Sequence, residues 1–158
     1  KRWMREASPE RQALVRHACR TLIKAGHREC LSVLGFGEPK VRLNHFRVVT
    51  HVVMLGEALV FDLEMVSASG SGQNLILDYV IHHVKANGTT SPKVFKWKRV
   101  VLKSGGVHAA RRRHTIKPVT TRRYYSGTHR VEIVVNGASL GSKPFDLVVP
   151  EEHPHSSR

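Results

Sequence analysis

The period of the hydrophobic pattern changes near residue 37, and this change limits the chain to a short helical segment followed by a β-rich domain. Before it, apolar residues recur at helical spacing behind Ser8-Pro9, a typical helix start. We expect one amphipathic helix over 9–25 and a shorter helix over 27–34, which together form a helical hairpin. A hairpin cannot bury its apolar stripe alone, so it either covers the following domain or ends a helical stack.

Beyond residue 37, apolar and polar residues alternate, as they do in strands that bury one face. We expect strands over 59–66, 75–84, 93–102, 131–135 and 145–149, with weaker strands over 41–54 and 107–116. The dipeptide Asn136-Gly137 is typical of a type I′ hairpin turn. The pattern predicts a mainly β protein, an immunoglobulin-like antiparallel β-sandwich of about seven strands preceded by the short helical hairpin.

These elements divide the chain into three parts. Residues 1–37 form the helical hairpin, residues 38–150 form the β-sandwich, and residues 151–158 form a polar tail that we expect to be disordered. Because the first residue is Lys1 and no targeting segment follows it, we expect the chain to be part of a longer polypeptide. No apolar stretch approaches the roughly 20 residues of a membrane-spanning helix, so we expect no membrane partner.

The net charge of +14 is concentrated in one part of the chain. Residues 93–130 contain 12 Lys and Arg residues and no Asp or Glu. Cations without internal counter-charges repel one another, and a polyanion compensates this repulsion. The pattern therefore favours nucleic acid as a partner, with a solvated basic surface as the alternative.

The most informative basic segment is the loop around Arg122-Arg123-Tyr124-Tyr125. Two adjacent guanidinium groups, two aromatic rings and nearby hydroxyls suit hydrogen bonds to phosphate and stacking on bases. A tyrosine at this corner of an immunoglobulin-like fold commonly has a purely structural role, which is the alternative for either tyrosine.

Further basic residues occur on the first helix and on two predicted strands. Arg16, Arg20 and Lys24 are spaced to form one ridge, and we expect Phe95 and Trp97 to face inward, with the lysines beside them facing water. The candidate DNA-binding residues are Arg16, Arg20, Lys96, Lys98, Arg111, Arg112, Arg113, Lys117, Arg122, Arg123, Tyr125 and Arg130.

The sequence gives no sign of a metal, cofactor or catalytic site. His82 and His83 are adjacent on a predicted strand, so they point to opposite faces and cannot chelate one ion. Asp62 and Glu64 share a face but have no histidine, phosphate-binding loop or nucleophile near them in sequence. The two cysteines have no metal-ligand spacing and at most one possible bridge, so the reducing cytoplasm is the default compartment.

Several strings of residues resemble one known family. These are residues 14–20 (LVRHACR), 77–96 (LDYVIHHVKANGTTSPKVFK), 118–125 (PVTTRRYY) and the turn at Asn136-Gly137. They resemble the C-terminal region of bacterial DNA alkylation repair proteins, the HEAT-like-repeat 3-methyladenine DNA glycosylases of the AlkC/AlkD type that carry an immunoglobulin-like domain after the repeats.

The resemblance implies a parent enzyme that hydrolyses the N-glycosidic bond of cationic N3- or N7-alkylated purines. The catalytic carboxylate of this family belongs to upstream repeats, so no catalytic residue is expected in this chain. The partners implied are double-stranded DNA and the upstream helical repeats, in the bacterial cytoplasm and at the nucleoid when bound. A structural or protein-interaction sandwich that only caps the helical solenoid is the alternative.

Overall fold

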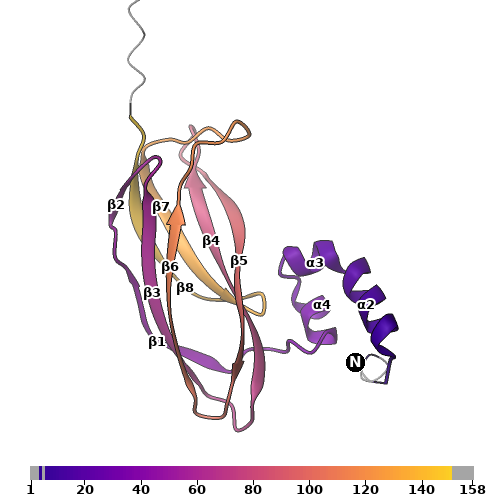
Figure 1. The fold of residues 1–158 in the computed structure, drawn as a ribbon. Coiled ribbons are helices and arrows are strands. Elements are labelled where there is room, and N and C mark those ends of the chain that lie inside the picture. The colour runs from indigo at the N-terminus through magenta and orange to yellow at the C-terminus, as the bar shows by residue number, and fades with distance from the viewer. Residues whose placement is uncertain (1–3, 5, 151–158) are drawn as a thin grey trace, which may run out of the picture.

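The computed structural model describes residue 4 and residues 6–150, so the expected tail lies outside the described residues. In the described part of the chain, three helices precede a two-layered β-sandwich and lie beside one of its layers (Figure 1). The helices are α2 (Pro9–Ala18), α3 (Arg20–Lys24) and α4 (Arg28–Val33). Because most of the described elements are strands in two packed sheets, the predicted mainly β fold class is confirmed.

The expected single helix over 9–25 is wrong in one respect, because it is divided at Cys19 into α2 and α3. The start is as expected: Pro9 occupies the first turn and the hydroxyl of Ser8 accepts a hydrogen bond from the Arg11 backbone N–H at 3.4 Å. Cys19 has φ −86° and ψ 6°, outside helical values, although its N–H still donates to the Val15 carbonyl at 2.9 Å. Hydrophobic spacing cannot report the dihedral angles of one residue.

Eight strands form two sheets. The strands are β1 (Val41–Val48), β2 (Val52–Met54), β3 (Ala58–Ser67), β4 (Gln73–Val84), β5 (Thr90–Leu102), β6 (Val107–Thr115), β7 (Gly127–Val135) and β8 (Ala138–Val148). One sheet has the order β1-β3-β6 and the other the order β2-β8-β7-β4-β5. Every pair is antiparallel except β2 with β8, which is parallel.

The weak strand expected over 41–54 is two strands in different sheets, which is why there are eight strands instead of about seven. At the crossing, the N–H of Val49 still donates to the Val60 carbonyl of the first sheet at 2.8 Å. The carbonyl of His51 already accepts from the Asp146 N–H of the second sheet at 2.8 Å. The chain therefore changes sheets within three residues, and this brings β2 alongside β8 in the parallel direction.

The core lies between the two sheets and follows the predicted alternation. Leu59, Phe61, Leu63 and Met65 of β3 are all at most 2% exposed. Phe61 packs edge-on against Tyr79 of β4, with ring centroids 5.3 Å apart. This packing makes the sandwich a rigid support for the side chains on its outer faces.

The turn between β7 and β8 has the predicted type I′ geometry and also holds the helices. Asn136 and Gly137 have φ values of 48° and 79°, as this turn requires. The side-chain amide of Asn136 donates to the Gly37 carbonyl at 2.8 Å, while its oxygen accepts from the Ile76 N–H at 2.7 Å. Gly137 packs so closely on the Gly26 carbonyl that a Cβ at position 137 would overlap it. The helices are thus fixed to the sandwich at this joint.

Candidate nucleic-acid interface

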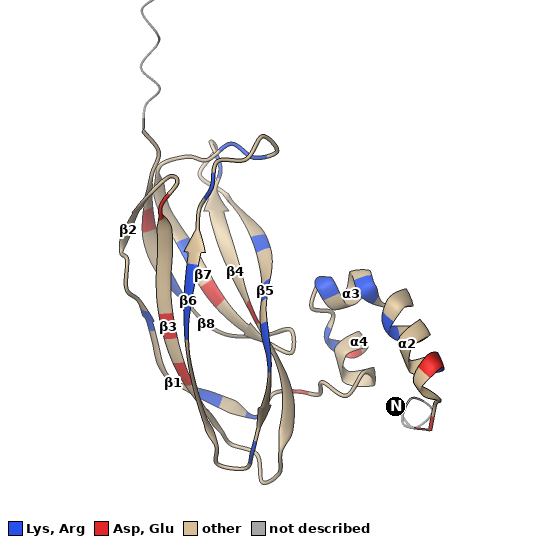
Figure 2. Ribbon diagram, viewed as in Figure 1, with Lys and Arg blue, Asp and Glu red and all other residues tan. Residues whose placement is uncertain are grey.

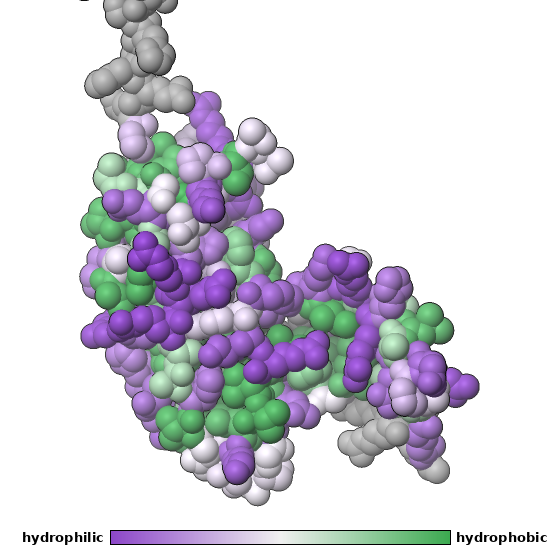
Figure 3. Space-filling model, in the orientation of Figure 1, coloured by the Kyte–Doolittle hydropathy of each residue, from purple (hydrophilic) through white to green (hydrophobic). Residues whose placement is uncertain are grey.

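A cleft of about 420 Å³ lies between the helices and β5. Figure 3 shows hydrophilic side chains along this junction, with apolar surface between them. The basic lining residues are Arg16, Arg20 and Lys24 from α2–α3 and Lys96, Lys98 and Arg99 from β5; the other lining residues are Ile23, Leu31, Leu34, Phe36, Ile76, Asp78 and Trp97. Figure 2 shows Lys and Arg positions in blue on α2–α3 and on β5. The fold therefore brings together basic residues from distant parts of the chain.

The three basic residues of the predicted ridge stay on one side of the helices, although the predicted helix is divided at Cys19. Arg16, Arg20 and Lys24 are all exposed, and all three line the cleft on the side that faces the sandwich. The apolar residues Leu14 and Leu22 are 68% and 44% exposed. The polar face of these helices is thus directed at the sandwich, and part of their apolar face is left uncovered.

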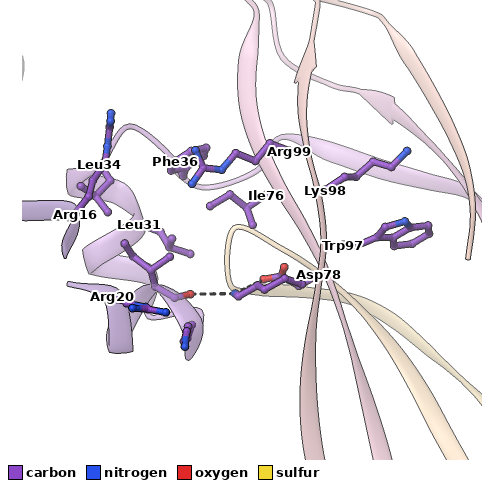
Figure 4. A pocket seen from close by; sticks show the side chains of 13 residues that line it. Arg16, Arg20, Leu31, Leu34, Phe36, Ile76, Asp78, Trp97, Lys98 and Arg99 are labelled. Carbon is purple, nitrogen blue, oxygen red and sulfur yellow. Dashed lines mark hydrogen bonds and ion pairs between the residues drawn. The ribbon is translucent and has the colours of Figure 1, made fainter. Parts of the chain in front are cut away.

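Lys96 is exposed, as expected, but its ammonium group is also held by neighbouring residues. Its ammonium group donates to Asp78 Oδ2 at 2.7 Å and to the Ile23 carbonyl at 3.0 Å, so it connects β4, β5 and α3 (Figure 4). Asp78 is 2% exposed, and its Oδ1 has no hydrogen-bond partner among the described residues. Burial raises the pKa of Asp78, against the opposing effect of Lys96. The alternation of β5 could not reveal this buried partner on another strand.

Arg99 lines the cleft but was not among the predicted site residues. In the ladder between β4 and β5, Leu77 pairs with Lys98 and Asp78 pairs with Lys96, which leaves Trp97 in a β-bulge. The bulge changes the alternation after Trp97, so Arg99 points toward the helices and lies over the Phe36 ring, 5.4 Å from its centroid. Lys98 is exposed and points away from the helices (Figure 4).

The three arginines of β6 alternate between the faces of the strand, and among the described residues only one of them has no neighbouring acceptor or ring. Arg111 bonds to Asp62 at 2.8 Å, and this contact is the main reason that the pKa of Asp62 lies well below its usual range. Arg112 turns inward and lies over the Tyr79 ring at 5.5 Å. Arg113 is exposed. Of this triplet, Arg113 is the best placed to contact a ligand.

The structure separates the paired arginines of the loop that follows β6. Arg123 is exposed, with its guanidinium 5.6 Å from the centroid of the Tyr125 ring. Arg122 is half-buried, and its Nη1 is buried without a hydrogen-bond partner in the described part of the chain. Lys117 and Arg130 are exposed. The two guanidinium groups are therefore not equally available to phosphate, because Arg122 is half-buried.

The buried ring of His83 occupies the space beneath this loop. It packs edge-on against Tyr124 at 5.3 Å and His129 at 5.5 Å. Burial and the neighbouring Arg122 hold the pKa of His83 at about 3. Tyr124 thus has a packing role, as the structural alternative supposes, whereas the equally half-buried Tyr125 has its ring beside Arg123.

The two adjacent histidines point to opposite faces, as predicted. His83 is buried, and His82 contacts Glu132 on the outer face at 2.6 Å. Within residues 4 and 6–150, no group of three or more His, Cys, Asp or Glu side chains is arranged to hold a metal ion. The described helices include none that is long and apolar enough to cross a membrane.

Comparisons with known proteins agree on the kind of domain. The family model described as "Uncharacterised protein YhaZ, C-terminal Ig-like domain" matches residues 42–149. The Bacillus subtilis (strain 168) protein YhaZ is 28% identical over 140 residues, which is 88% of this chain and 39% of YhaZ.

One similar solved structure is the Pseudomonas fluorescens alkylpurine DNA glycosylase AlkC, which was solved bound to DNA containing an abasic site analog. It matches this chain with a TM-score of 0.83 and 37% identity. The match covers 89% of this chain and 40% of AlkC. A β-glucosidase from Listeria innocua matches with a TM-score of 0.58 and 15% identity over 72% of this chain and 17% of that chain, a likeness of fold alone.

The chain thus spans about two fifths of the length of YhaZ and AlkC. The family match covers well over half of the chain and includes every strand except the first residue of β1. The chain belongs to the family of YhaZ C-terminal Ig-like domains.

Proposed function

We propose that this chain is the DNA-binding C-terminal segment of a DNA alkylation repair glycosylase that excises cationic N3- or N7-alkylated purines. In this proposal the segment grips the duplex backbone, and the chemistry belongs to helical repeats upstream of it. The exposed residues Leu14 and Leu22 on α2–α3 are where such repeats would pack. The similarity to AlkC supports the assignment, since that enzyme was solved with DNA bound.

The observation that carries the proposal is a set of exposed cations that have no acidic partner among the described residues. Arg16, Arg20, Arg113 and Arg123 are exposed and form no ion pair with a carboxylate of the described residues. Such side chains are available for backbone phosphates, and each phosphate contact releases condensed counterions. Phosphate contacts carry no base identity, so the binding should depend little on sequence.

A binding experiment with the isolated chain tests this proposal. Titrations use two duplexes of unrelated sequence and a methylated copy of one of them. We expect the same affinity for all three, because the contacts are to the backbone. A large and salt-insensitive preference for one sequence would contradict the proposal.

A structural cap for the helical array is the second candidate. It is favoured by the partners that Arg111 and Lys96 already have, since cations held by Asp62 and Asp78 are less available to DNA. A cap predicts no binding to any of the three duplexes at low salt. The same titrations therefore separate the two candidates.

A further inference from the structure

The cleft between α2–α3 and β5 has an excess of positive charge on facing walls. Six Lys and Arg residues line it, and Asp78 is its one described acidic residue. Arg16, Arg20 and Lys24 form one wall, and Arg99 projects from the other toward the helices (Figure 4). Like charges that face each other across a narrow gap repel, and this repulsion is relieved when an anion lies between them.

The two walls are held in a fixed relation by one set of contacts within the cleft and another at the neighbouring turn. The Lys96 ammonium joins the α3 carbonyl of Ile23 to Asp78, while Gly26 packs against Gly137 at the turn. A charged site whose walls are already in place loses little conformational freedom on binding. The arrangement therefore suits a ligand that carries several negative charges in a row.

A volume of about 420 Å³ is in the range of ligand sites and exceeds the needs of a single small anion. The apolar base of the cleft includes Ile23, Leu31 and Ile76. A strand of nucleic acid supplies both kinds of contact, since its phosphates alternate with less polar sugars. A small inorganic anion would satisfy only part of one wall.

We propose that this cleft is the site where one strand of duplex DNA passes between the helices and the sandwich, with its phosphates bound from both walls. The inference rests on the proposed DNA-binding function and specifies its location. In this site, Asp78 restrains Lys96: the buried carboxylate holds the ammonium group within the joint and keeps it from the phosphates. Lys96 is the one cleft cation that the structure pairs with a carboxylate.

The first test compares two double variants of equal charge. Arg20→Ala with Arg99→Ala removes one cation from each wall, whereas Arg42→Ala with Lys143→Ala removes two exposed cations outside the cleft. For the cleft variant, we expect the slope of log K against log salt to become shallower by about 1.8, at about 0.9 per phosphate. The control variant should keep the wild-type slope.

The second test is a gain of binding, which an unfolded variant cannot imitate. Asp78→Asn keeps the shape of the side chain but removes the negative charge that attracts Lys96, so we expect several-fold tighter binding at low salt and a slope steeper by about 0.9. In a Lys96→Met background, the same substitution should have no effect on binding. Melting temperatures of all variants show whether the fold is kept.

The outcomes distinguish the inference from the function on which it rests. If wild type binds DNA and the cleft variant binds like its charge-matched control, the cleft site is wrong and the DNA-binding function stands. If wild type does not bind DNA, both are wrong. If inorganic phosphate raises the melting temperature of wild type but not of the cleft variant, while DNA binding is equal in both, the cleft binds a small anion and not a DNA strand.

Discussion

The close contact between Gly26 and Gly137 predicts a large effect of adding one methyl group. Gly137→Ala places a Cβ onto the Gly26 carbonyl, which is backbone and cannot rotate away. It also forces alanine into a φ of 79°, which costs about 1–2 kcal/mol for an L-residue. To relieve the overlap, the helices must move away from the sandwich.

Gly88→Ala is a matched control for the backbone term. Gly88 has a φ of 78°, nearly that of Gly137, but an added Cβ there meets nothing within 4 Å. The control should therefore lose only about 1–2 kcal/mol of the free energy of unfolding. The melting temperature falls by about 2–4 °C per kcal/mol in a domain of this size.

Gly137→Ala should lose further free energy of unfolding, because it disrupts hydrogen bonds between the helical segment and the sandwich. Movement of the helices breaks the Lys96 bond to the Ile23 carbonyl and the Asn136 bond to the Gly37 carbonyl. Charged and neutral hydrogen bonds contribute about 1.5–3 and 0.5–1.5 kcal/mol, so the excess over the control should be about 2–4.5 kcal/mol.

Urea unfolding measures both variants, and a DNA titration shows whether the helical ridge has moved from β5. We expect Gly137→Ala to weaken DNA binding and Gly88→Ala to leave it unchanged. Equal stability losses and equal affinities for the two variants would refute the account of the joint.

Three further predictions concern the arginines of the loop after β6, the buried His83 and the release of alkylated bases. Arg123→Ala should make the salt dependence of DNA binding shallower by about 0.9 and leave the melting temperature unchanged. Arg122→Ala should lower the melting temperature. The reverse pattern would contradict the partial burial of Arg122 and the exposure of Arg123. Because His83 has a pKa of about 3 when folded and near 6.5 when unfolded, its neutral form stabilises the fold above pH 6.5, and this contribution falls as the pH approaches 3. Urea unfolding across this pH range should show that His83→Leu loses less free energy of unfolding at low pH than wild type does. A pH profile equal to that of wild type would contradict this role of His83. The isolated chain should release no base from methylated duplex DNA, and measurable turnover would show that the chemistry is not confined to upstream repeats.

The layers of this fold follow from its sequence because their signals are local and repeated. In β3, each inward residue from Leu59 to Met65 is apolar, so the strand and its buried face are both predictable. The φ values of Asn136 and Gly137 likewise follow from their dipeptide. The division of the first helix at Cys19 does not, because it depends on the dihedral angles of one residue.

The site was less predictable because its geometry depends on contacts across the fold. The bulge at Trp97 has no sequence signal, yet it turns Arg99 toward the helices. The density of Lys and Arg in the sequence identified the basic segment 93–130, but it could not show which of these side chains are held by other residues. The partner of Lys96, Asp78, lies on a neighbouring strand, and Arg122 is half-buried near His83. Both facts became evident only in the structure.

The central claim is that the chain binds duplex DNA through backbone phosphates, and its most direct test is the salt dependence of binding. The equilibrium constant of the wild-type chain for a short undamaged duplex is measured over a series of salt concentrations. If Arg16, Arg20, Arg113 and Arg123, four exposed arginines without an ion pair among the described residues, each contact one phosphate, log K falls linearly with log salt with a slope of about −3.6 or steeper. Binding that does not change with salt, or no binding at low salt, would contradict the claim.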